Sequence, residues 1–220
     1  MLPRLLPLPT LLAACLALQP EVQAGTLHAR VADAGGRPLA DAVVTAVPAG
    51  ARPDAPKLHA AVEDQIDREF VPYVQPIHTG TSVSFPNKDD IRHHVYSFSP
   101  AKTFELPLYA GTPASPVLFD KPGVVRLGCN IHDWMVGYLY VTDAPFFGKT
   151  SAQGSLSLEG LPPGTYTLKA WHPRMEGSEA STARQVEVRD GEPATVQWAL
   201  KLRREFRPPR TPLPGAAGYR

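Results

Sequence analysis

Residues 119–141 read FDKPGVVRLGCNIHDWMVGYLYV, in which two apolar runs enclose a short polar loop. Runs rich in Val, Leu and Tyr are typical of buried strands, so the loop is expected to connect two strands. It places Cys129, His132 and Met135 in a Cys-x2-His-x2-Met pattern. The stretch therefore predicts a β-rich unit that carries three soft side chains on one connection.

These three side chains are three of the four donors of a particular metal site. One Cys and two His in a trigonal arrangement, with a weak axial Met, are the ligands of a mononuclear blue-copper centre. A zinc site more often contains a second Cys or a carboxylate. The loop therefore predicts a copper site whose missing ligand is a distant histidine.

Residues 83–99, VSFPNKDDIRHHVYSFS, supply that histidine. Here the chain resembles the cupredoxins, the small blue copper proteins of the amicyanin and plastocyanin type. The family places its first His ligand six residues after an Asn and two before a Val, and Asn87, His93 and Val95 match this spacing. The resemblance implies that His93 is the fourth ligand, with His94 as the alternative. It covers about residues 60–142, including FVP (70–72), GTSVSFPN (80–87) and FDKPG (119–123).

The segments on either side resemble a second family. Residues 25–44 and 150–173 look like the opening and later strands of a carboxypeptidase regulatory-like domain. The fold class expected is all-β, a cupredoxin Greek-key sandwich inserted in or joined to a small prealbumin-like sandwich. Residues 57–143 would form the cupredoxin, and residues 25–56 and 144–202 the second sandwich. The whole chain is similar to bacterial proteins called methylamine utilization protein.

Short strands separated by Gly, Pro, Asn or Asp predict an antiparallel sandwich or barrel. Residues 26–49 hold two alternating apolar runs around Gly35-Gly36, the pattern of a β-hairpin. Residues 58–70 fit either a helical face or a short strand. Further strands are expected at residues 73–85, 95–98, 117–119, 124–127, 137–141, 155–158, 166–171, 184–188 and 194–202.

Charge and composition exclude several classes of function. The chain has 22 Lys and Arg against 21 Asp and Glu, so its formal net charge is +1. This balance argues against a nucleic-acid partner, an acidic substrate or a polybasic membrane surface. The 25 Pro and 17 Gly argue against a helical bundle, because both residues break helices. After the N-terminal segment, no apolar run is long enough to predict a transmembrane span.

The first 24 residues have the pattern of a secretory signal peptide. Arg4 precedes an apolar run over residues 5–18, and a polar stretch ends at Ala24. Export implies a periplasmic, oxidising location, in which Cys129 would be the one remaining cysteine. The alternative is a lipobox ending at Cys15, which would make the protein a lipoprotein. Residues 203–220, with five Arg and four Pro, predict a disordered tail.

The ligand set favours a periplasmic carrier of single electrons, holding one type 1 copper per chain. The resemblance implies that His132 emerges at an apolar surface where a redox protein docks, a small and transient interface. The alternative is a copper-binding module for delivery, storage or sensing, although the chain has only three Met. A structural sandwich with a degenerate site is the third hypothesis. The oligomeric state is left open.

An enzyme is not expected. Copper oxidases and nitrite reductases need further His clusters, and no Ser/His/Asp or phosphate-binding signature stands at credible spacing. Trp134 is expected to be a packing or rim residue beside the site. The remaining histidines have no second ligand type at useful spacing and are expected to be structural, namely His28, His59, His78 and His172.

Overall fold

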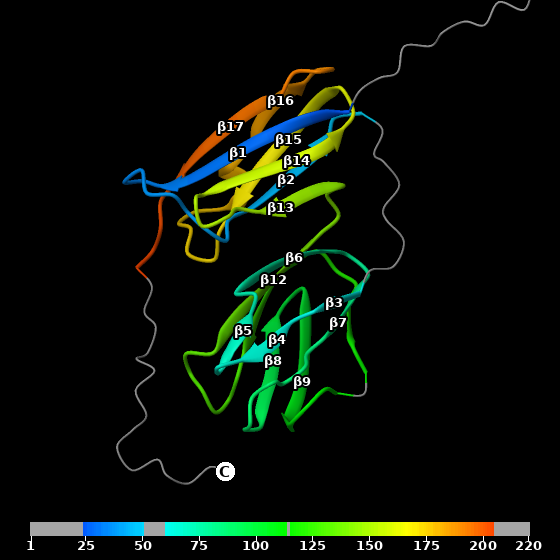
Figure 1. Cartoon of the computed structure of the whole chain (residues 1–220), viewed down its shortest axis with the longest axis vertical. Helices are drawn as coiled ribbons and strands as arrows, with labels where there is room; N and C mark the ends of the chain where they lie inside the picture. The colour runs from blue at the N-terminus through cyan, green and yellow to red at the C-terminus, as the bar shows by residue number, and fades with distance from the viewer. Residues whose placement is uncertain (1–23, 51–59, 114, 205–220) are drawn as a thin grey trace, which may run out of the picture.

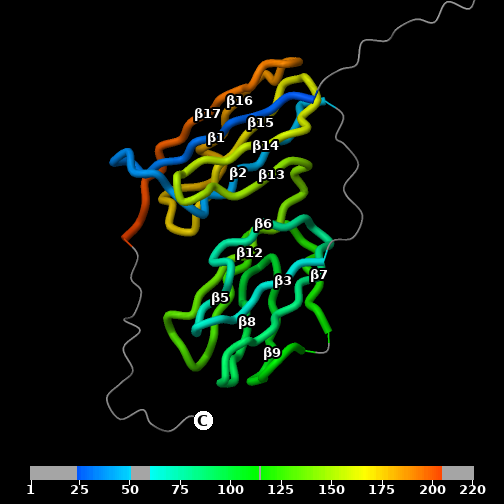
Figure 2. The backbone as a smooth tube through the Cα atoms, viewed as in Figure 1, coloured from blue at the N-terminus to red at the C-terminus, as the bar shows by residue number. Residues whose placement is uncertain are grey.

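The computed structural model describes residues 24–50, 60–113 and 115–204. Within these ranges the chain forms 17 strands, one short 3-10 turn (η1, Glu179–Thr182) and no α-helix. The all-β expectation is confirmed. The strands gather in two bodies that lie one above the other in Figure 1, and the tube in Figure 2 shows the chain leaving the first body, building the second and returning.

The lower body contains strands β3 to β12 and carries the predicted ligands. Its larger sheet has the order β6-β12-β11-β8-β9, and a smaller sheet has the order β10-β7-β3. β4 and β5 form a separate hairpin. The strand bounds are β3 Ala60–Val62, β4 Asp64–Ile66, β5 Glu69–Val71, β6 Val74–His78, β7 Thr81–Ser84, β8 His93–Ser99, β9 Lys102–Tyr109, β10 Val117–Phe119, β11 Gly123–Gly128 and β12 Val136–Thr142.

Alternation along these strands turns one set of apolar side chains inward. Phe85, Val95, Phe119, Leu127 and Leu139 are all at most 1% exposed and belong to one core cluster. Cys129 and Met135 lie in the same cluster, so the predicted ligands are set into the rim of a packed core rather than onto a free loop. Such packing restricts their side-chain rotamers.

The upper body contains strands from both ends of the chain. One sheet has the order β14-β1-β17 and the other β13-β2-β15-β16, and their inward side chains form a second core. The bounds are β1 Gly25–Asp33, β2 Val43–Pro48, β13 Phe146–Lys149, β14 Ser155–Leu161, β15 Gly164–Trp171, β16 Arg184–Val188 and β17 Ala194–Leu200. The domain boundaries inferred from sequence stay predictions, because residues 51–59 are outside the described ranges.

The hairpin predicted for residues 26–49 is wrong. β1 pairs with β14 and β17, while β2 pairs with β13 and β15, so the two strands belong to opposite sheets. The turn at Gly36 (φ 82°) is real, but beyond it only Ala32 and Pro38 form a bridge. Both edges of β1 are occupied by later strands, so the chain crosses from one sheet to the other.

Other strand predictions differ in extent. The described part of residues 58–70 forms β3, β4 and the start of β5, which excludes the helical alternative there. Residues 73–85 divide into β6 and β7 around Gly80, whose φ of 90° lies in the left-handed region that glycine adopts readily. β9 and β13 were not predicted. The strand at residues 194–202 ends earlier, at Leu200.

An aromatic cluster joins the two bodies. Trp171 of β15 contacts Tyr138 and Tyr140 of β12, with ring centroids 6.0 and 5.3 Å apart. Val43 of β2 and Val74 of β6 are buried in the same cluster. Burial of this apolar surface stabilises the contact between the bodies.

Some predictions fall outside the described residues, namely the signal peptide, the lipobox at Cys15, His59 and most of the tail. Among the residues that are described, no helix is long and apolar enough to cross a membrane.

Candidate metal centre

Three of the predicted ligands come from adjacent elements at one end of the lower body. His93 is the first residue of β8, and Cys129 follows the last residue of β11. His132 lies in the loop between β11 and β12, which is closed by a hydrogen bond from the Met135 N–H to the His132 carbonyl (2.9 Å). Gly128 pairs with Tyr96, which brings the end of β11 beside β8.

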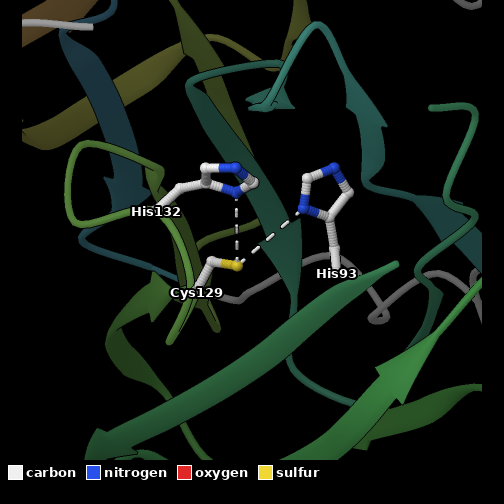
Figure 3. Close-up of side chains that lie close together, drawn as sticks. All are labelled: His93, Cys129 and His132. Atoms are coloured by element: carbon white, nitrogen blue, oxygen red, sulfur yellow. Dashed lines mark hydrogen bonds between the residues drawn. The ribbon is translucent and has the colours of Figure 1, made fainter. Parts of the chain in front are cut away.

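The three donor atoms converge, as Figure 3 shows. Cys129 Sγ lies 3.9 Å from His93 Nδ1 and 4.0 Å from His132 Nδ1. All three ligand atoms lie within 4.8 Å of one another. Among the described residues, no other group of three or more His, Cys, Asp or Glu side chains brings its ligand atoms this close together. His93 and His132, which are 36 and 3 positions from Cys129 along the chain, thus both point at the Cys129 sulfur.

These separations fit a single metal ion. Bonds of about 2.3 Å to sulfur and about 2.0 Å to nitrogen place the two atoms about 3.6 to 3.8 Å apart around one ion. The observed 3.9 and 4.0 Å are slightly wider. One thiolate with two imidazoles matches the strong ligands of a trigonal copper site.

The electrostatics of the group favour the thiolate. Burial alone would raise the pKa of the Cys129 thiol, but its contact with His93 and hydrogen bonds from the backbone N–H groups of His94 and Ile131 bring it below its ordinary value. Burial works to lower the pKa of His93, whereas its contacts with Cys129 and Asp89 raise it overall. Because the thiolate is the metal-binding form of Cys, the site is prepared for a cation.

His132 differs from His93 in its surroundings. The His93 side chain is fully buried, whereas His132 is half-buried and packs at a tilt against Trp134, with ring centroids 5.0 Å apart. Burial, together with the charge of His93, lowers the pKa of His132. His132 is thus the more exposed of the two histidines, and Trp134 packs beside it at the rim.

Met135 and His94 are placed differently with respect to this group. Met135 is 1% exposed and lies in the core cluster that contains Cys129. His94 is buried outside the group of three: its ring lies 5.6 Å from that of Tyr96, and its Nε2 lies 2.9 Å from Glu105 Oε1. Strand alternation explains this, because neighbouring residues of β8 face opposite sides of the sheet.

Two polar residues stand beside the site: Asn87, which the family spacing had already marked, and Asp89, which was not singled out from the sequence. Asp89 Oδ2 lies 2.7 Å from His93 Nε2. The Asn87 amide donates to the carbonyls of Ile91 and Tyr109 and so fixes the segment that leads into β8. Both stand in the NKDD segment just before the histidine pair, but only the fold shows which carboxylate faces the ring.

The other described histidines do not join the group. His28 is exposed on β1, and His78 packs edge-on against Phe147 of the upper body, with ring centroids 4.5 Å apart. His172 is buried, and its Nδ1 accepts a hydrogen bond from the Arg174 N–H. Leu108 is an exposed residue of β9.

Comparisons with known proteins find similar structures but no matching sequence family. No protein-family model and no curated protein sequence matches the chain. Structural matches include the Cu-containing nitrite reductase (NirK) from Thermus scotoductus SA-01, with 24% identity and a TM-score of 0.37 over 44% of this chain and 25% of that one. This chain thus spans about a quarter of the reductase.

Smaller proteins match along nearly their whole length. A purple cupredoxin from Nitrosopumilus maritimus is 23% identical, with a TM-score of 0.33 over 38% of this chain and 99% of that one. The reduced state of an amicyanin mutant is 20% identical, with a TM-score of 0.34 over 44% of this chain and 99% of that one. Each match spans less than half of this chain, so any functional inference has to come from the side chains of the site.

Proposed function

We propose that this protein is a mononuclear type 1 copper protein that carries single electrons in the periplasm. The observation that supports it is the convergence of one thiol and two imidazoles, from β8 and the β11–β12 loop, on a point at the edge of a packed core. His93, Cys129 and His132 would hold the ion, with Met135 as the axial ligand. Copper bound there would supply a one-electron redox couple.

The surroundings suit that role. A ligand loop anchored in a β-sandwich core changes little when the charge of the ion changes, which keeps the reorganisation small. His132 and the exposed Ile131 lie on the same loop, so the half-buried imidazole would offer a contact for a redox protein. The upper sandwich would serve as a scaffold, and no enzymatic reaction is assigned to the chain.

The absorption spectrum of the copper-loaded protein tests the coordination. We expect an intense visible thiolate-to-Cu(II) band that is lost in Cys129→Ser, because serine offers no thiolate. Circular dichroism of the variant should still report a folded β protein. An intense band that persists in Cys129→Ser would refute the assignment.

A comparison of the two histidines tests the ligand choice. His93→Ala should weaken Cu(II) binding much more than His94→Ala, because only His93 faces the Cys129 sulfur. Isothermal titration of both variants measures the difference. Equal losses, or a larger loss for His94→Ala, would refute the assignment of His93.

Repeated voltammetry distinguishes an electron carrier from a module that delivers copper. A carrier should cycle reversibly and should not lose Cu(I) to a chelator of moderate affinity within minutes. Rapid release of Cu(I) on reduction, with slow electron exchange, would favour delivery instead.

A further inference from the structure

Asp89 accepts hydrogen bonds from a ligand and from a distant hairpin at the same time. Its Oδ2 lies 2.7 Å from His93 Nε2 and 2.9 Å from the backbone nitrogen of Arg68. Its Oδ1 lies 2.7 Å from the backbone nitrogen of Asp67. Three donors thus meet on one carboxylate whose side chain is 12% exposed.

The hairpin needs such support because of its turn. Asp67 and Arg68 connect β4 to β5, and both have left-handed backbones, with φ of 54° and 62°. Side chains with a Cβ adopt this conformation at a cost of about 1 to 2 kcal/mol per residue. Because Asp89 accepts both N–H groups of the turn, it stabilises the conformation and holds the hairpin against the segment before β8.

The contact with His93 determines which ring nitrogen can bind a metal. A histidine that donates through Nε2 keeps its lone pair on Nδ1. His93 Nδ1 is the atom that faces the Cys129 sulfur at 3.9 Å. A partner of this kind fixes both the tautomer and the orientation of a ligating ring.

We propose that Asp89 is a positioning residue of the copper site, which ties the His93 ring to the β4–β5 turn so that Nδ1 faces Cys129 before the metal binds. The proposal rests on the copper-binding function proposed above. Ordering a ligand in advance removes an entropic cost from binding. Loss of an outer partner of this kind typically lowers metal affinity by about 10- to 100-fold.

Copper affinity is compared in Asp89→Ala and Asp90→Ala, measured against a competing chelator. Asp90 is a matched control, because it is the next carboxylate and lines the same cleft as Asp67, Arg68, Asp89 and Trp134. Asp89→Ala should raise the Cu(II) dissociation constant about 10- to 100-fold, while Asp90→Ala leaves it within about twofold. Equal affinities in the two variants would overturn the proposal.

A second variant separates the ligand contact from the turn. It carries Asp67→Asn and Arg68→Gly in addition to Asp89→Ala. The β4–β5 turn then contains an Asn-Gly pair, which favours left-handed backbones. Hydrogen exchange should show the hairpin protected again, while the copper affinity stays low. Recovery of the copper affinity would overturn the proposal, because Asp89 would then act only through the turn.

The metal-free protein provides a readout that does not depend on copper. At alkaline pH, the ring ¹⁵N shifts of His93 should report the Nε2–H tautomer in the unsubstituted protein and a loss of that preference in Asp89→Ala. An unchanged tautomer in the variant would overturn the proposal. Failure of the unsubstituted protein to give a thiolate–copper band would refute the proposed function, whereas the tautomer would still decide the role of Asp89.

Discussion

Gly128 precedes Cys129, and the Tyr96 ring lies directly over it. A Cβ added at Gly128 would lie 2.7 Å from Cζ, 2.8 Å from Oη and 3.1 Å from Cε2 of that ring. Ordinary contacts between such atoms are about 3.5 to 4.0 Å, so the ring would have to move by roughly 1 Å. Gly128 also pairs with Tyr96 and Val136 in the sheet, which keeps its strand from yielding instead.

We therefore expect Gly128→Ala to lower the free energy of unfolding by about 1 to 3 kcal/mol, the usual cost of overpacking. In a Tyr96→Ala background the clash is absent. There the same substitution should be neutral or stabilising by about 0.4 to 1 kcal/mol, because alanine restricts the unfolded chain. The sign of the effect should thus depend on the ring.

Urea denaturation of the metal-free single and double variants measures this coupling. The copper-loaded Gly128→Ala protein should also show a shifted visible band, since Cys129 is the next residue. Additive free energies in the double-mutant cycle, or a stable Gly128→Ala protein, would refute this reasoning about the contact.

Three further predictions concern other parts of the molecule. Burial raises the pKa of Glu63, so the contribution of Glu63 to folding stability should be greatest below the ordinary carboxyl range and should fall as pH rises from that range toward the raised pKa. Glu63→Gln should remove this contribution and stabilise the protein by about 1 to 3 kcal/mol at neutral pH, as urea denaturation of both proteins across pH would show. Trp171→Ala should destabilise the protein by about 2 to 4 kcal/mol and split its thermal unfolding into two calorimetric transitions, with the visible band unchanged; one unsplit transition would contradict this. Met135→Leu should keep the colour and raise the reduction potential measured by voltammetry, because a weak donor to Cu(II) is lost; loss of copper would count against a trigonal site.

The ligand loop could be predicted from the sequence because its information is local. Cys129, His132 and Met135 stand within seven residues, and the apolar runs on either side are strands in the structure. The pairing of β1 and β2 could not be predicted, because it depends on later strands that compete for both edges. Periodicity shows which face of a strand is buried but not which neighbour it joins.

Two omissions have similar causes. β9 contains Pro107, which argues against a central strand, but β9 is at the edge of its sheet, where a missing N–H is tolerated. The role of Asp89 depends on a turn about twenty residues earlier in the chain, and Asp90 beside it offers the same side chain. Only the folded structure distinguishes the two carboxylates.

The order of the strands also has a consequence for how the protein folds. All strands of the larger sheet of the lower body lie between Val74 and Thr142 in the sequence. In contrast, β1 pairs with β17 near the other end of the chain, with Leu27 opposite Ala194. Pairings between distant residues form slowly, because a long loop has to close first. We therefore expect the body that carries the candidate metal centre to assemble before the other one closes around the chain ends, so that a half-folded protein would already present the metal ligands.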